Sequence, residues 1–221
     1  MSIEKKKKTA YIAFFLDKIY IYSYNERKCV LKGSFMKLFI ASDLHGSSYY
    51  CEKMIHAIEK EAPDQVLLLG DLLYHGPRND LPRDYAPKKV IEMLNAISKD
   101  LLCVRGNCEA EVDQMVLSFP VLADYAWLSV NGIRIFATHG HHHSEQNPPP
   151  FKKGDILLCG HTHVPAWNQH EDFYYLNPGS LSIPKEQSCH SYMTLEDQTF
   201  SWKDLDGGTY HTLTIESGTE K

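Results

Sequence analysis

Short apolar runs that end in aspartate, asparagine or histidine recur along this chain, and they constrain its fold more than any other feature. The five runs are 40–45 (IASDLH), 67–71 (LLLGD), 104–107 (VRGN), 136–139 (FATH) and 158–163 (LCGHTH). Apolar runs of this length, bounded by turn residues, are typical of buried strands. In an open α/β sheet, ligands bind just outside the carboxyl ends of the strands. The sequence therefore predicts an α/β fold with one shared site at the strand ends.

The first half of this region predicts alternating strands and helices. Ser47 or Ser48 is a suitable N-cap for a helix that ends near Glu61. A second helix is expected from Pro87, because proline suits the first helical turn, and a short helix is expected after Asn107. Helical crossovers place successive strands in parallel. The strands expected here are 37–42, 65–69 and 101–104.

The second half predicts a β-rich arrangement. Asn131 and Gly132 separate two apolar runs, 127–130 and 133–137, and such a dipeptide is typical of a tight hairpin turn. Further strands are expected near 156–159, 164–169, 173–176, 191–195, 199–202 and 209–215. We expect this half to be mainly antiparallel. Two packed sheets flanked by helices would then form one domain over residues 36–221.

Two hypotheses apply to residues 1–35, which form an N-terminal extension. Four lysines at 5–8 precede an apolar run, as in a secretory signal, but charged residues soon interrupt it and no small-residue cleavage site follows. One hypothesis is that translation begins at Met36, because codons for residues 32–34 can contain a purine-rich ribosome-binding sequence. The alternative is that the segment is made and residues 19–24 form an added strand or hairpin.

Composition excludes several classes of protein. The net charge of −5, without a basic stripe, argues against a nucleic-acid partner. No apolar stretch is long enough to predict a membrane span. The six cysteines include no CxxC pair, which argues against a structural zinc site and suits a reducing cytoplasm. We therefore expect a cytoplasmic protein without a membrane partner.

Each motif alone is common in ordinary turns, but agreement of all five in this order by chance is improbable. Together they resemble the calcineurin-like metallophosphoesterase superfamily and, more narrowly, the bacterial YfcE-type phosphodiesterases. The narrower resemblance lies in 70–79 (GDLLYHGPRN), 105–108 (RGNC) and 177–180 (NPGS), and it covers residues 36–215. It implies a four-layer α/β/β/α sandwich, with two mixed sheets flanked by helices, and two divalent metal ions.

The resemblance also implies which side chains bind these metals. Seven are assigned: Asp43, His45 and His163 to one metal, Asn107, His139 and His161 to the other, and Asp71 bridging both. This makes Asp71 and Asn107 catalytic residues as well as ligands. Mixed oxygen and imidazole donors suit Mn²⁺, Fe²⁺ or Zn²⁺. The resemblance favours Mn²⁺, with Zn²⁺, Fe²⁺ and Ni²⁺ as alternatives.

The implied activity is hydrolysis of a small phosphodiester by in-line attack of a hydroxide that bridges the metals. Other functions stay open. The same fold serves as a non-catalytic scaffold in a retromer subunit, and a phosphomonoesterase, a protein phosphatase or a nuclease would use similar motifs. Exposed aromatic strands would also suit a homo-oligomer. The physiological substrate is not evident from the sequence.

Cys108 departs from the wider superfamily, in which many phosphatases have a histidine that protonates the leaving oxygen. A thiol is a poorer proton donor than an imidazolium at neutral pH. We therefore expect a preference for esters with acidic leaving groups, unless His75 or His141 donates the proton. The alternative is that Cys108 only packs. Glu109 stands where relatives commonly have aspartate, and the sequence assigns it no specific role.

Residues 72–86 form a long loop rich in proline and aspartate, and loops of this length often carry function. His75 and Arg78 in this loop are candidates for substrate binding, because the planar guanidinium can contact a phosphate through two parallel hydrogen bonds. The alternative roles are loop structure and an ion pair between subunits.

Overall fold

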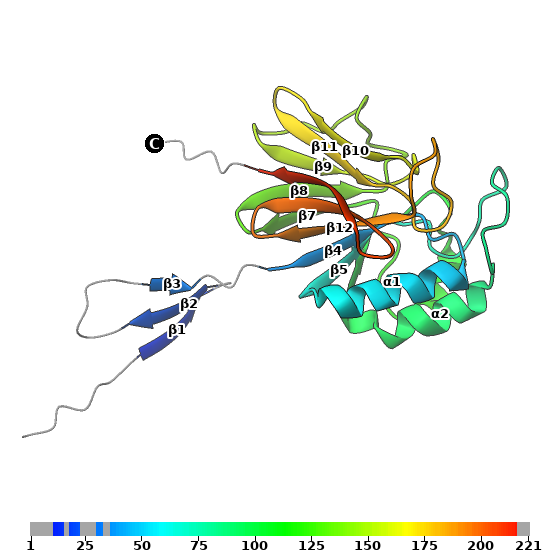
Figure 1. Ribbon diagram of the computed structural model, residues 1–221, viewed down its shortest axis with the longest axis horizontal. Helices are drawn as coiled ribbons and strands as arrows, with labels where there is room; N and C mark the ends of the chain where they lie inside the picture. The colour runs from blue at the N-terminus through cyan, green and yellow to red at the C-terminus, as the bar shows by residue number, and fades with distance from the viewer. Residues whose placement is uncertain (1–10, 16–17, 23–29, 33–35, 216–221) are drawn as a thin grey trace, which may run out of the picture. The chain divides into compact units, whose positions relative to one another are not determined.

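The computed structural model describes residues 11–15, 18–22, 30–32 and 36–215, and the chain divides into two compact units, Met1–Phe35 and Met36–Lys221. The first unit contains a three-stranded antiparallel sheet of β1 (Tyr11–Phe15), β2 (Lys18–Tyr22) and β3 (Val30–Lys32). The strand expected at 19–24 coincides with β2 over residues 19–22, and its last two residues lie outside those described. The second unit holds all remaining elements (Figure 1).

A six-stranded sheet forms one half of the second unit, in the order β14-β13-β12-β4-β5-β6. Its strands are β4 (Leu38–Ala41), β5 (Gln65–Leu68), β6 (Leu101–Cys103), β12 (Ser191–Glu196), β13 (Thr199–Asp204) and β14 (Thr209–Thr214). The first three are parallel, and the last three form an antiparallel meander that joins β4 through β12. The carboxyl ends of β4, β5 and β6 therefore share one edge of the sheet.

A five-stranded sheet forms the other half, in the order β10-β11-β9-β8-β7. Its strands are β7 (Tyr125–Val130), β8 (Ile133–Thr138), β9 (Asp155–Leu158), β10 (Pro165–Gln169) and β11 (Phe173–Pro178). Asn131 and Gly132 have positive φ and connect β7 to β8 in the expected hairpin. The second half is mainly antiparallel, as expected, and β9 is the exception because it is parallel to β8 and β11. The long connection over residues 139–154 explains this, because it returns the chain to the opposite end of the sheet.

Helices cover the outer face of the six-stranded sheet (Figure 1). They are α1 (Ser48–Glu61) and α2 (Pro87–Ala96). A 3₁₀ turn at Ser98–Asp100 follows α2, and the short α3 (Glu111–Val116) contributes no buried side chain. Ser47 caps α1 by accepting a hydrogen bond from the Tyr50 amide, and Pro87 begins α2, as the sequence predicts. Within the described part of the chain, no helix is long and apolar enough to cross a membrane.

The two sheets pack face to face, and β4 shows why its sequence is continuously apolar. Leu38 and Ile40 pack between the sheets, whereas Phe39 and Ala41 pack against the helices. Successive side chains of a strand point to opposite faces, so a strand buried on both faces needs apolar residues throughout. The α/β class and the two mixed sheets are confirmed.

The outer face of the five-stranded sheet differs from the helix-flanked layer that the resemblance implies. In the ranges described, no helix packs there. Phe151 from the connection 139–154 instead packs against Phe173, with ring centroids 4.9 Å apart, above a cluster that includes Phe136 and Tyr175. Three consecutive prolines at 148–150 explain the absence of a helix in this connection, because proline lacks the amide proton and clashes with the preceding turn.

Glu61 at the end of α1 ties the helical layer to the six-stranded sheet. Its carboxylate accepts hydrogen bonds from Lys203 Nζ at 2.7 Å and the Tyr192 hydroxyl at 2.9 Å, and it lies 2.9 Å from Lys37 Nζ. Burial alone would raise the pKa of Glu61, but Lys203, Lys37 and Tyr192 outweigh burial and lower this pKa to about 2. The ionised carboxylate therefore stabilises the fold.

We predict that Glu61→Gln lowers the free energy of unfolding at pH 7 by about 2 kcal/mol. The folded pKa lies below the ordinary value of 4.5, so this contribution is present above pH 4.5 and is lost as pH falls toward 2. Urea unfolding at pH 7 and pH 3 should show a smaller difference from the parent protein at pH 3. Glu59→Gln, on the exposed face of α1, is the control. An equal difference at both pH values would contradict the prediction.

Candidate metal centre

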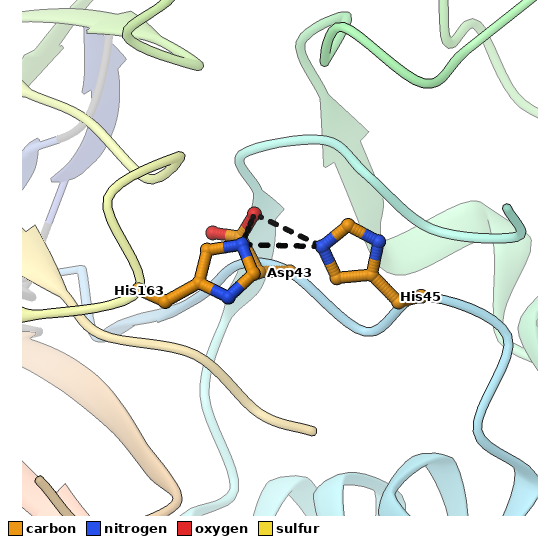
Figure 2. Close-up of side chains that lie close together, drawn as sticks. All are labelled: Asp43, His45 and His163. Carbon is orange, nitrogen blue, oxygen red and sulfur yellow. Dashed lines mark hydrogen bonds and ion pairs between the residues drawn. The ribbon is translucent and has the colours of Figure 1, made fainter. Parts of the chain in front are cut away.

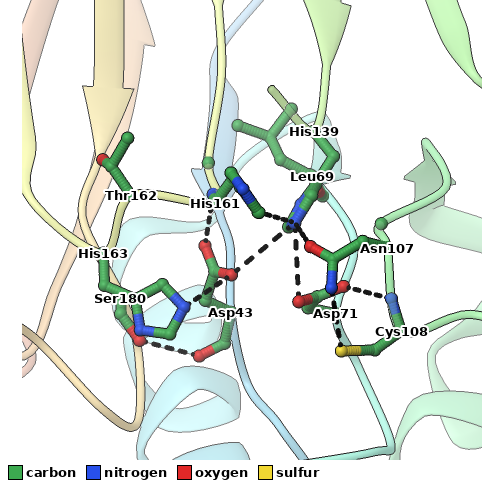
Figure 3. Close-up of polar contacts among 12 residues, drawn as sticks. Asp43, Leu69, Asp71, Asn107, Cys108, His139, His161, Thr162, His163 and Ser180 are labelled. Atoms are coloured by element: carbon green, nitrogen blue, oxygen red, sulfur yellow. Dashed lines mark hydrogen bonds and ion pairs between the residues drawn. The ribbon is translucent and has the colours of Figure 1, made fainter. Parts of the chain in front are cut away.

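The loops after five strands bring the seven predicted ligands together at one end of the sandwich (Figures 2 and 3). β4, β5 and β6 supply three of these loops from the six-stranded sheet, and β8 and β9 supply two from the other. The parallel strands of each sheet end at this edge, so residues far apart in sequence become neighbours. The side chains that meet there are Asp43, His45, Asp71, Asn107, His139, His161 and His163.

Asp43, His45 and His163 form the first donor cluster (Figure 2). His163 Nε2 lies 3.3 Å from His45 Nε2 and 3.2 Å from Asp43 Oδ1. His45 Nε2 lies 3.5 Å from the same Asp43 oxygen. All three side chains are buried. Two nitrogens and one oxygen therefore face a common point.

Asn107, His139 and His161 form the second donor cluster (Figure 3). His139 Nε2 lies 3.1 Å from Asn107 Oδ1 and 3.2 Å from His161 Nδ1. His139 is fully buried, whereas Asn107 and His161 are more accessible. This cluster is therefore open toward solvent on one side.

Asp71 lies between the two clusters. Its Oδ2 atom is 3.6 Å from His45 Nε2 and 3.5 Å from His139 Nε2. Its Oδ1 atom accepts a hydrogen bond of 2.9 Å from the Cys108 amide, which fixes the orientation of the carboxylate. One carboxylate oxygen thus faces both groups of donors.

The tautomers of three histidines follow from their backbone contacts. In each of the three, Nδ1 lies close to a backbone carbonyl oxygen. Nδ1 of His45 is 2.8 Å from the Tyr74 oxygen, and Nδ1 of His139 is 2.7 Å from the Leu69 oxygen. Nδ1 of His163 is 2.7 Å from the Ile183 oxygen. A carbonyl oxygen can only accept, so each Nδ1 carries the proton and donates it. In the neutral ring, each Nε2 is then an unprotonated acceptor that points into the site.

With these tautomers and neutral rings, hydrogen-bond acceptors on neighbouring side chains face one another. The Nε2 atoms of His45 and His163 are 3.3 Å apart, and His139 Nε2 is 3.1 Å from the oxygen of Asn107. Buried Asp43 Oδ1 accepts no hydrogen bond among the described residues. Such contacts repel unless positive charge lies between the atoms. The donor set therefore fits divalent cations.

The electrostatics of the cluster lead to the same conclusion. Burial would raise the pKa of Asp43, but His163 and His45 outweigh it and hold this pKa well below the usual value. Burial would likewise lower the pKa of His139, but Asp71 and Asp43 raise it to about 9. The buried carboxylates thus favour positive charge in the centre.

The backbone of the ligand loops is strained. Asp43, His45, Asp71, His161 and His163 all have φ between 49° and 66°, in the left-handed region. Non-glycine residues rarely adopt this region, and such outliers cluster at functional sites. Gly160 shows how closely these loops approach one another, because a Cβ atom there would overlap Ser42 Oγ. The loops are held in positions that the local chain does not favour.

Glu109 holds two of the ligand loops together, a role that the sequence did not reveal. Its buried carboxylate accepts hydrogen bonds from the amides of Asp71 at 2.9 Å, Leu72 at 2.7 Å and Gly106 at 2.5 Å. The loops after β5 and β6 are therefore joined through one side chain. The only signal in the sequence was an acidic residue two positions after Asn107, and backbone partners leave no pattern of residue types.

The end of β11 and the turn that follows it support the loops that carry Asp43 and His161. Asn177 Nδ2 donates to the Gly160 carbonyl at 2.7 Å. Ser180 Oγ donates to the Asp43 carbonyl at 2.9 Å (Figure 3). Both side chains are fully buried. This turn contributes hydrogen bonds to the backbone and no donor to the metal clusters.

The two candidate proton donors lie in different surroundings. Cys108 lines the open cleft beside the second cluster, and its Sγ accepts a hydrogen bond of 3.3 Å from Asn107 Nδ2. Burial, and then the charge of Asp71, raise the pKa of the Cys108 thiol. His141 packs beside His139 and does not line this cleft. Burial, and then the neighbouring histidines, lower the pKa of His141 to about 4, so its imidazole is neutral near pH 7.

The two candidate substrate-binding residues also differ in position. Arg78 lines the cleft, together with Gly76 and Asn79 from the same loop. His75 packs between the rings of Tyr74 and Tyr85, at centroid distances of 4.8 and 5.3 Å, and does not line the cleft. The structure thus brings Arg78, but not His75, to the surface of the cleft.

With this geometry, the comparisons with known proteins identify the family. Residues 36–199 match the calcineurin-like phosphoesterase superfamily domain. The chain therefore belongs to the calcineurin-like phosphoesterase superfamily.

Individual relatives give more specific matches within this superfamily. The chain is 43% identical to phosphodiesterase YfcE of Escherichia coli strain K12 over 166 residues, which cover 75% of this chain and 90% of the relative. The solved structure of YfcE, a phosphoesterase from E. coli, superposes with a TM-score of 0.80 at 41% identity, covering 82% of this chain and all of that one. A phosphodiesterase of Methanocaldococcus jannaschii is 23% identical over 167 residues, covering 72% of this chain and 87% of that protein.

A more distant match shows how widely the fold is used. Vacuolar Protein Sorting 29 from Cryptosporidium parvum superposes with a TM-score of 0.55 at 20% identity, covering 82% of this chain and all of that one. This likeness concerns the fold alone.

We predict that Glu109→Gln weakens metal retention about 10–100-fold. Both carboxylate oxygens accept from backbone amides, so either orientation of the glutamine amide places its NH₂ group against a backbone N–H. Metal content after dialysis against graded chelator concentrations measures the effect, and urea unfolding reports the loss of stability. Glu111→Gln, on the exposed surface of α3, is the matched control. Metal retention equal to that of the parent protein would rule out this positioning role.

Proposed function

We propose that this protein is a dimetal phosphodiesterase that hydrolyses small phosphodiesters. The observation that carries the proposal is the position of Asp71 Oδ2, about equally far from a nitrogen of each donor cluster. Two divalent ions held about 3.5–4 Å apart activate water and stabilise negative charge on the phosphoryl oxygens. The 43% identity to phosphodiesterase YfcE supports the same activity.

The role of this chain is to hold the ligands in a fixed arrangement. Asp43, His45 and His163 would hold one ion, Asn107, His139 and His161 the other, and Asp71 would be shared. Fixed Nδ1 tautomers and strained loops mean that little reorganisation accompanies binding of the ions or the substrate. Oxygen and imidazole donors suit Mn²⁺, Zn²⁺ and Fe²⁺ alike. The resemblance to YfcE-type phosphodiesterases supports Mn²⁺ as the native metal, and metal analysis would distinguish it from Zn²⁺, Fe²⁺ and Ni²⁺.

Cys108 is proposed to determine the choice of leaving group. It lines the cleft beside Asn107, where a proton donor to the leaving oxygen would lie. A thiol donates a proton poorly there, so the leaving group must be stable as an anion. The proposed substrates are therefore diesters with acidic leaving groups.

Several broader proposals accompany this activity. The convergence of all seven donors favours an enzyme over a non-catalytic scaffold. All five cysteines that the structure describes are free, which supports a cytoplasmic location. The family match from residue 36 onward supports the proposal that translation begins at Met36, which N-terminal analysis of the native protein would test. Homo-oligomerisation is a further proposal, which light scattering would test.

We predict that Asp71→Asn lowers hydrolysis of bis(p-nitrophenyl) phosphate by about 10³-fold or more, because the amide removes the charge shared by both donor clusters. Metal content should fall in the same variant. The control is Asp172→Asn, which makes the same change at an exposed aspartate that is not a candidate ligand. Retained turnover by the metal-depleted variant, or no turnover by the parent protein with Mn²⁺, would refute the proposed function.

We predict that Cys108→His reduces the dependence of rate on leaving-group pKa. The imidazolium would protonate the leaving oxygen, so esters with poor leaving groups should gain most. A series of aryl phosphodiesters with graded leaving-group pKa values gives the slope for both proteins, and Cys108→Ser controls for loss of the thiol. An unchanged slope in Cys108→His would assign Cys108 a packing role only.

A further inference from the structure

The cleft over the metal centre is larger than one phosphate group requires. It encloses about 510 Å³. Asp71, Asn107, His161 and His163 line it on the side of the metal clusters, and residues 76–79 and Lys185 also contribute to its lining. Sites for small ligands typically have volumes of about 300–1,000 Å³. The cleft can therefore contact parts of a substrate that lie beyond the reacting phosphate.

Lys185 belongs to a segment that is bound to the metal-ligand loops. Its backbone amide donates to the His163 carbonyl at 3.1 Å. Two residues earlier, the Ile183 carbonyl accepts from His163 Nδ1 at 2.7 Å, and the Ile183 amide donates to Ser180 Oγ at 3.0 Å. The backbone position of Lys185 is therefore fixed relative to a metal ligand.

Arg78 is carried by a similarly ordered turn. The Asn79 amide donates to the Gly76 carbonyl at 3.2 Å, and Asn79 Nδ2 donates to the His75 carbonyl at 2.9 Å. A Cβ atom placed on Gly76 would lie 3.5 Å from Cys108 Sγ, so this turn packs against the second metal loop. Both cationic residues therefore extend from segments attached to the site.

The charges of these two side chains are not neutralised by an ion pair within the described part of the fold. Arg78 and Lys185 are exposed, and neither forms an ion pair with any residue that the structure describes. Lys37, Lys53 and Lys203 all have carboxylate partners in the same structure. Two unpaired cations in one cleft of a chain with net charge −5 create a local positive field that attracts anions.

We propose that Arg78 and Lys185 bind a second phosphate group of the substrate, beyond the phosphate that reacts. This inference rests on the proposed phosphodiesterase function and names its substrate class: a diester that carries an additional phosphate. The metal clusters receive the reacting phosphate, and the two cationic side chains are the groups in the cleft that can pair with a further anion.

A matched pair of substrates tests the proposal. Thymidine 5′-(p-nitrophenyl phosphate) and its 3′-phosphorylated form have the same leaving group and differ only by one phosphate on the retained arm. We expect the Mn²⁺-loaded protein to show kcat/KM about tenfold or more higher for the 3′-phosphorylated substrate, mainly through a lower KM. This preference should decrease between about 50 mM and 500 mM salt, because the cations are exposed.

Substitutions assign the preference to the two side chains. Lys185→Gln and Arg78→Gln should each lower the ratio of the two kcat/KM values at least threefold, and the double variant should bring it near one. Lys88→Gln, which removes one exposed charge from α2, should leave the ratio unchanged. Folding of each variant is checked by thermal unfolding and metal content.

The outcomes separate this inference from the function on which it rests. Equal turnover of both substrates by the parent protein would overturn the second phosphate site and leave the phosphodiesterase function intact. A preference that survives in the double variant would also overturn it. No turnover of either substrate, or of bis(p-nitrophenyl) phosphate, would overturn both.

Discussion

The repulsion between buried acceptors at the strand ends is the constraint on which the site depends. With Nδ1 donating to a backbone carbonyl, the neutral rings of His45 and His163 direct Nε2 acceptors at each other across 3.3 Å, and buried Asp43 Oδ1 faces both of them. A polypeptide would not adopt this arrangement for stability alone, because acceptors without donors are costly when buried. Positive charge in the centre removes the cost. The same unfavourable contacts would therefore favour the binding of cations.

The rest of the fold holds this arrangement in place. A left-handed backbone at a non-glycine residue costs on the order of 1 kcal/mol, and five ligands share it. Two apolar cores, one between the sheets and one beneath the helices, provide the stability that offsets this strain. Glu109 and Asn177 then fix the ligand loops through backbone hydrogen bonds. Glu61 thus stabilises the fold from the end of α1, whereas the candidate ligands lie on loops after the strands.

The sequence predicted the structure where a pattern of neighbouring residues determines the backbone conformation of the same segment. The apolar runs located the strands, Ser47 and Pro87 marked helix starts, and Asn131-Gly132 marked the hairpin. It was less informative where the partner is distant or is backbone. The role of Glu109 and the presence of Lys185 in the cleft depend on loops that meet only after folding. The loop layer over the outer face of the five-stranded sheet was also missed, although the prolines at 148–150 argued against a helix there.

The sequence by itself determined the α/β class, the order of the motifs and the chemical types of the candidate metal donors. Each of these follows from short runs of consecutive residues. Only the tertiary structure decided which oxygen of Asp71 lies between the two clusters and which nitrogen of His45, His139 and His163 faces the site. It also decided that Arg78 lines the cleft while His75 packs between two tyrosines. The physical reason is that these facts depend on distances between atoms of different strands and loops, and packing of the two sheets sets those distances.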